Sequence, residues 1–130
     1  MPKVLAKIEK IARNRASDPK CRCYHIAAIF KGNEILAIGQ NSNKTHPKIQ
    51  DYQYHPFSRL HAELAACIRF GHTDCRKYNI AVIRVDRNGK LNQSCPCDGC
   101  KSVINQLRFK KVYFTNEYGN WESYIPAHNL

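Results

Sequence analysis

Long apolar runs are missing from the sequence, and acidic residues are scarce. No apolar segment approaches the roughly 20 residues that a helix needs to cross a bilayer, so no membrane partner is expected. Residues 1–20 carry too many charges to contain the apolar centre of a secretion signal, which favours a cytoplasmic location. A length of 130 residues with a hydrophobic fraction of 43% suits one compact domain, predicted over residues 1–130.

The shortage of acidic residues leaves a strong positive charge. Asp and Glu number 10 against 21 Lys and Arg, which gives a formal net charge of +11. Such an excess indicates an anionic partner, either a nucleotide or a nucleic acid, because Lys and Arg bind phosphate groups. A charge that serves solubility alone is the simpler alternative.

The cysteine content does not suit a disulfide framework. The chain has 7 cysteines, an odd number, and no export signal accompanies them. Thiols that stay reduced remain available as metal ligands. Three of the cysteines cluster in SCPCDGC, at Cys95, Cys97 and Cys100, and this clustering favours a metal site.

Three segments have the pattern of helices. Apolar residues recur at helical spacing over residues 3–16. A second helix is expected over residues 59–70, with Ser58 as its N-cap and Gly71 at its end. A third helix follows Cys97, and its apolar positions are Val103, Ile104 and Leu107.

Short apolar runs between these helices predict strands. The runs 24–30 and 34–40 flank a Lys-Gly-Asn turn and predict a β-hairpin. Residues 79–85 are rich in β-branched side chains with almost no alternation, which suits a strand buried on both faces. Residues 110–115 form a further predicted strand, and residues 121–125 are a candidate for a last edge strand.

The resulting order is α-β-β-α-β-α-β, before the candidate edge strand. Two of the strands each follow a helix, so right-handed crossovers and parallel neighbours are expected. Helices that cover a central sheet make an α/β layered domain.

Two short motifs open the second and third helices. RLHAELAAC supplies His61, while Cys97 and Cys100 are three residues apart and therefore share a helical face within reach of one ion. Helix N-termini carry partial positive charge, which favours thiolates. Two thiolates and one imidazole leave Zn²⁺ a fourth, open position, which is typical of a catalytic site. Cys95 is interpreted as a bystander.

Glu63 lies two residues after His61, close enough to contact a water in that open position without binding the ion. Zinc lowers the pKa of bound water to about 7. A carboxylate beside the water can take its proton and pass it on. The alternative is a structural zinc knot in which Glu63 is incidental.

At His61-Ala62-Glu63 and Pro96-Cys97-x-x-Cys100 the chain resembles the cytidine and deoxycytidylate deaminase superfamily. The likeness continues upstream through ASDPKCRCYHIAAIFKGNEILAIGQN and covers about residues 5–115. It implies a three-layer α/β/α cytidine-deaminase-like domain with a central mixed sheet of four to five strands.

The resemblance also implies a chemical role for each residue of the motifs. His61, Cys97 and Cys100 would hold zinc, whose hydroxide attacks C4 of cytosine, while Glu63 shuttles protons and ammonia leaves. Members often complete the pocket with a loop of a neighbouring subunit, so a homo-oligomer is expected. The implied substrate contacts are the backbone of Ala62, the side chain of Asn41 and the ring of Tyr113.

Two departures from deoxycytidylate deaminases leave the substrate open. Gly39-Gln40-Asn41-Ser42 stands where Gly-Tyr-Asn-Gly is usual, and Ala65 stands in place of an Asn. The leading hypothesis is deamination of a free cytosine nucleotide, dCMP or CMP. The first alternative is a cytosine deaminase of single-stranded DNA or RNA, with adenine deamination on RNA as a variant. The second alternative is a non-catalytic zinc module that binds nucleic acid.

A long polar loop follows the predicted hairpin, and loops bind ligands disproportionately. Aromatic residues alternate there with basic ones, a pattern that can stack the bases of a single strand. The basic side chains are as often merely solvated. Candidate phosphate contacts in this loop are Lys44, His46, His55 and Arg59. Candidates for a second zinc site, against the favoured interpretation as free groups, are Cys21, Cys23, Cys75, His46 and His55.

Overall fold

The fold was analysed in a computed structural model, which describes residues 1–17, 25–41, 61–86 and 88–126. Within these residues the helices are α1 (Val4–Ala16), α2 (Ala62–Phe70) and α3 (Asp98–Leu107). The strands are β1 (His25–Lys31), β2 (Glu34–Gln40), β3 (Asn79–Val85), β4 (Leu91–Asn92), β5 (Lys111–Thr115) and β6 (Trp121–Tyr124). No described helix is long and apolar enough to cross a membrane.

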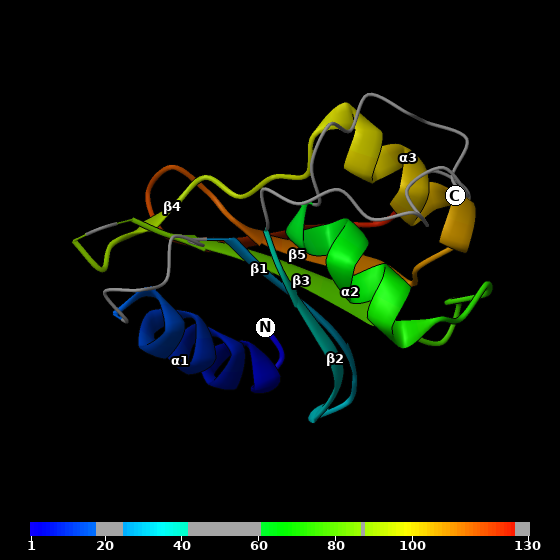
Figure 1. The fold of residues 1–130 in the computed structure, drawn as a ribbon, viewed down its shortest axis with the longest axis horizontal. Helices are drawn as coiled ribbons and strands as arrows, with labels where there is room; N and C mark the ends of the chain where they lie inside the picture. The colour runs from blue at the N-terminus through cyan, green and yellow to red at the C-terminus, as the bar shows by residue number, and fades with distance from the viewer. Residues whose placement is uncertain (18–24, 42–60, 87, 127–130) are drawn as a thin grey trace.

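The strands form one mixed sheet in the order β2-β1-β3-β5-β6, with the short β4 paired to β3 (Figure 1). β1 and β2 are an antiparallel hairpin, and β1 also pairs antiparallel with β3. β3 and β5 run parallel, with α3 in the connection between them, so the predicted parallel neighbours are confirmed. The predicted four to five strands correspond to the five strands of the main path, and β4 adds a sixth.

Helices cover both faces of the sheet, so the predicted three-layer α/β/α architecture is confirmed (Figure 1). Side chains of β1 alternate between the two faces, as expected of a strand. Ile26, Ala28 and Phe30 pack in the cluster under α1. Ala27 and Ile29 pack in the opposite cluster, which lies under α2 and α3.

The central strand β3 is buried on both faces, as its continuous apolar sequence predicts. Ile80 and Val82 face the α2 and α3 layer, whereas Ile83 faces α1. Each of these side chains is at most 1% exposed. Full burial of such a side chain contributes on the order of 2 kcal/mol, so β3 anchors both halves of the core.

One boundary differs from the sequence expectations. α2 begins at Ala62 with His61 as its N-cap, so the expected start at residue 59 with Ser58 as N-cap is wrong; Ser58 itself lies outside the described residues. Gly71 ends α2 in the left-handed conformation at φ 73°, as predicted. The candidate last strand is confirmed as β6, which pairs antiparallel with β5.

The hairpin touches α2 closely at Gly39. A Cβ atom at this position would lie 2.2 Å from the backbone nitrogen of Ala66 and 2.5 Å from the carbonyl oxygen of Ala62. Only a residue without a side chain therefore lets β2 support the first turns of α2. This contact sets the position of the helix whose N-cap is His61.

Replacing Gly39 tests that contact. We expect Gly39→Ala to reduce the free energy of unfolding by about 3 kcal/mol or more, because the clash is with backbone that cannot rotate away. Gly32→Ala is the matched control, since Gly32 has φ 60° but no atom within 4 Å of an added Cβ, and should cost only about 1 to 2 kcal/mol. Urea unfolding measures both; equal losses would contradict the close contact.

Candidate metal centre

His61 reaches the candidate site from the start of α2. It adopts an extended backbone conformation, φ −76° and ψ 155°, immediately before the first helical residue. Its carbonyl oxygen accepts a hydrogen bond from the backbone N–H of Ala65 at 2.9 Å, which begins the helix. The imidazole is thereby held at the positive end of α2.

The two cysteines come from the start of α3. Cys97 is the N-cap, with φ −67° and ψ 169°, and its carbonyl oxygen accepts a hydrogen bond from the N–H of Lys101 at 2.8 Å. Cys100 lies in the first turn and is only 1% exposed, whereas Cys97 is exposed. The pair thus presents one sulfur near the surface and one in the core.

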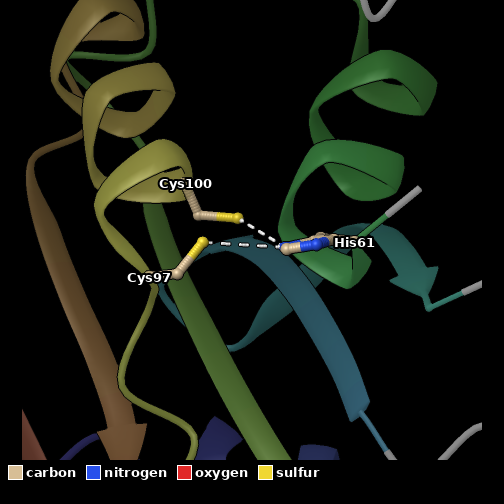
Figure 2. Close-up of side chains that lie close together, drawn as sticks. All are labelled: His61, Cys97 and Cys100. Carbon is tan, nitrogen blue, oxygen red and sulfur yellow. Dashed lines mark hydrogen bonds between the residues drawn. The ribbon is translucent and has the colours of Figure 1, made fainter. Parts of the chain in front are cut away.

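The three side chains converge in one cluster (Figure 2). Nδ1 of His61 lies 3.7 Å from Sγ of Cys97 and 3.4 Å from Sγ of Cys100. All three ligand atoms lie within 4.8 Å of one another. Tetrahedral zinc with ordinary Zn–S and Zn–N bonds separates such atoms by about 3.5 Å. The donor set and its spacing therefore fit Zn²⁺ and leave a fourth position.

Glu63 lies in the first turn of α2 and is only 6% exposed. Burial raises the pKa of this carboxyl group, while its own backbone N–H and the Cys100 thiol, which hydrogen-bond to it, oppose the shift. A buried acid next to a metal cluster suits proton transfer, because its pKa moves toward neutral pH. The structure thus places Glu63 in contact with one of the three candidate ligands, Cys100.

Burial also raises the pKa of the Cys100 thiol, and the charges of Glu63 and Cys97 add to this increase. A sulfur in that state resists ionisation unless a cation is present. Zinc binds cysteine as thiolate and would reverse the shift. The burial of Cys100 beside a carboxyl group is therefore most favourable when the ion is bound.

The remaining cysteines of the described residues do not join the cluster. Cys95 lies outside it, in agreement with its interpretation as a bystander. Cys67 belongs to the core on the α2 and α3 side, as expected. Cys75 is also buried in that core, and its sulfur lies 3.9 Å from the carbonyl oxygen of His72. The other second-site candidates, Cys21, Cys23, His46 and His55, lie outside the described residues.

The structure describes some of the predicted substrate contacts and not others. Asn41 follows β2 at the same edge of the sheet, where its side-chain oxygen accepts a hydrogen bond from the backbone N–H of His25 at 3.2 Å. Ala62 is fully buried in the first turn of α2. Lys44 and Arg59 lie outside the described residues.

Tyr113 is not brought to the metal centre, contrary to expectation. Its side chain packs in the cluster under α1, 7% exposed, with its ring centroid 5.7 Å from that of Phe30. Strand side chains alternate between faces, and Val112 is the neighbour that faces α2 and α3. One tyrosine that does pack on the α2 and α3 side is Tyr124 of β6, whose phenol pKa is raised by burial and by the charges of Cys95, Glu63 and Cys100.

Two residues near the site escape the sequence analysis. His25 opens β1, and burial followed by the charges of Arg84 and His61 lowers its pKa to about 4. Arg84 is the one charged residue in the run NIAVIRV of β3. A lone arginine in an otherwise apolar strand was the available signal, because such a side chain needs a reason to be there.

The comparisons with known proteins agree with this geometry. The sequence profile described as "Cytidine and deoxycytidylate deaminase zinc-binding region" matches residues 3–116. The chain therefore belongs to the cytidine and deoxycytidylate deaminase family. Membership indicates a deaminase enzyme, and the profile together with the His-Cys-Cys cluster identifies Zn²⁺ as its cofactor. A comparison with curated proteins gave no match.

Solved structures share the fold. The dCMP deaminase of cyanophage S-TIM5 in complex with dCMP and dUMP is 26% identical, with a TM-score of 0.57 over 91% of this chain and 85% of that chain. The cytidine deaminase of Burkholderia pseudomallei is 21% identical, with a TM-score of 0.59 over 95% of this chain and 91% of that chain. The cytidine deaminase of Mycobacterium leprae is 18% identical, with a TM-score of 0.54 over 97% of this chain and 96% of that chain.

Metal analysis of cysteine variants tests the ligand set. We expect the wild-type protein to bind about one zinc ion per chain, and Cys97→Ser or Cys100→Ser to lose it, because each removes one of three protein ligands. Cys95→Ser is the matched control, since it changes a neighbouring cysteine outside the cluster, and should keep its zinc. Elemental analysis after dialysis measures the zinc content. Loss of zinc from Cys95→Ser alone would make Cys95 a ligand and contradict the assignment of Cys97 and Cys100.

Proposed function

We propose that the protein is a zinc-dependent hydrolytic deaminase that converts a free cytosine nucleotide, dCMP or CMP, to the uracil nucleotide. The observation that carries the proposal is the cluster of His61, Cys97 and Cys100 with buried Glu63 beside it. The related cyanophage enzyme that was solved with dCMP and dUMP supports a nucleotide as the substrate.

The protein residues divide the chemistry between them. His61, Cys97 and Cys100 would hold zinc, which when bound supplies an acidified water at its open position. The Glu63 carboxylate would accept one proton from that water and donate it to the pyrimidine ring nitrogen, and would then accept a second proton, from the oxygen added to the ring carbon, and donate it to the amino group, which leaves as ammonia. The raised pKa of Glu63 suits both steps, because the same group must act as base and then as acid.

Two residues at the strand ends near the metal centre would orient the substrate. The side chain of Asn41 is already fixed by its hydrogen bond from the His25 backbone. Its amide can therefore bind the sugar or base with little further loss of side-chain conformational entropy. The backbone of Ala62, in the first turn of α2, is the proposed contact for the edge of the base. Ala62 lies on α2 directly after His61, and Asn41 directly follows β2, whose Gly39 is in close contact with α2.

The role of Glu63 has a direct test. We expect the zinc-loaded wild type to convert dCMP to dUMP, and Glu63→Gln to lower kcat by about 10²- to 10⁴-fold with zinc retained, because the amide cannot transfer the proton. Glu34→Gln is the matched control, an exposed change in the hairpin that should keep full activity. Retained zinc with no effect of Glu63→Gln would support the non-catalytic module instead.

A polynucleotide substrate is the second candidate, and the net charge of +11 favours it. If single-stranded DNA or RNA is the substrate, the protein should convert cytosine to uracil in an oligonucleotide, with activity that falls steeply between about 50 and 200 mM salt as phosphate contacts release counterions. Sequencing of treated strands measures the conversion. A reaction confined to free nucleotides at every salt concentration would exclude this candidate.

A further inference from the structure

A row of polar residues crosses the sheet at the strand ends nearest the metal centre. His25 of β1 lies directly opposite Arg84 of β3, and Arg84 lies opposite Asn92 of β4. On the far side of His25 the row continues to Asn41, whose backbone N–H donates a hydrogen bond to the His25 carbonyl oxygen at 3.3 Å. We call Asn41, His25, Arg84 and Asn92 the polar row.

The strand register places this row on the same face as the metal ligands. Ala27 and Val82 are partners across β1 and β3, and both belong to the cluster under α2 and α3. His25 and Arg84 form the next pair of the same face, two residues further along each strand. Directly opposite residues hold their Cβ atoms about 5 Å apart, so the two side chains are neighbours.

His25 also lies near one of the metal ligands, His61. Burial, the charge of Arg84 and the charge of His61 all lower the pKa of His25, so both residues act on its ring. His25 therefore links Arg84 to the cluster at the start of α2.

Arg84 itself is exposed and available. Neither ion pair of the described residues includes it, since these join Glu9 to Arg13 and Asp74 to Arg76. The carboxylate two residues along, Asp86, already accepts hydrogen bonds from the backbone N–H groups of Asn88 and Lys90 at 2.9 Å each. The polar row itself contains no acidic side chain to repel an anion.

We propose that Arg84, with His25 beside it, binds the 5′-phosphate of a mononucleotide whose cytosine ring lies at the metal centre. The proposal rests on the proposed function and adds its phosphate subsite. The phosphate lies at the opposite end of a nucleotide from the reacting amino group, and Arg84 is the exposed cation of the polar row, next to His25. A guanidinium group can donate two parallel hydrogen bonds to phosphate oxygens, a geometry that lysine lacks.

The test compares nucleotide with nucleoside in the zinc-loaded protein. We expect Arg84→Gln to lower the ratio of kcat/KM for dCMP to that for deoxycytidine by about 10- to 100-fold, mainly through KM, because a charge-assisted contact to phosphate is lost. Arg84→Lys should lie in between. Arg76→Gln is the matched control, because Arg76 is another exposed arginine, located before β3 at the other end of that strand. An unchanged ratio in Arg84→Gln overturns the proposal.

A binding measurement separates this proposal from the catalytic one. Calorimetric titration with dUMP needs no turnover, and we expect Arg84→Gln to weaken dUMP about 10-fold or more relative to wild type and to Arg76→Gln. If the wild type deaminates neither dCMP nor deoxycytidine, the proposed function fails, and this difference in dUMP affinity still decides the phosphate site. Equal dUMP affinity in Arg84→Gln and wild type overturns it.

A further arm distinguishes the two sources of phosphate. A single-stranded oligodeoxynucleotide with one internal cytosine offers phosphodiesters, whereas dCMP offers a terminal monoester. We expect Arg84→Gln to affect dCMP more than the oligonucleotide. An effect on the oligonucleotide alone would overturn the mononucleotide assignment. Thermal unfolding of each variant, expected within about 2 °C of wild type for an exposed substitution, checks that the fold is intact.

Discussion

The structure depends on one constraint: three ligand atoms from two helix starts must meet at one point. His61 and Cys97 are the N-caps of α2 and α3, and Cys100 lies one turn further on. Their convergence requires both helices to begin at the same edge of the sheet, which the antiparallel pairing of β1 with β3 and the parallel pairing of β3 with β5 provide. The sheet thus determines the distances between the three ligand atoms.

Two electrostatic effects at the metal centre act in opposite directions on its acidic groups. Burial makes ionisation of Glu63 and Cys100 unfavourable, so both groups depend on a nearby cation for their charged forms. The partial positive charge of two helix starts favours the same anions. Burial and a bound cation therefore act in opposite directions on the protonation of Glu63 and Cys100.

Local patterns in the sequence specify most of the elements and the metal ligands, because spacing within a helix or a strand is a local property. The i, i+3 cysteines and the His-x-Glu motif predict the cluster that the structure contains. When both faces of a strand are apolar, the local sequence does not show to which face a given residue points. For this reason Tyr113 was expected on the wrong face of the sheet. Arg84 and His25 meet only through the pairing of β1 with β3, which the sequence does not encode as a pattern.

The close approach at Gly39 has a consequence for the design of variants. Because β2 and α2 are in backbone contact there, the position of β2 fixes the start of α2 and with it the position of His61. A substitution that adds a side chain at Gly39 would therefore move the start of α2, and a loss of fold stability and a loss of metal affinity are expected to occur together.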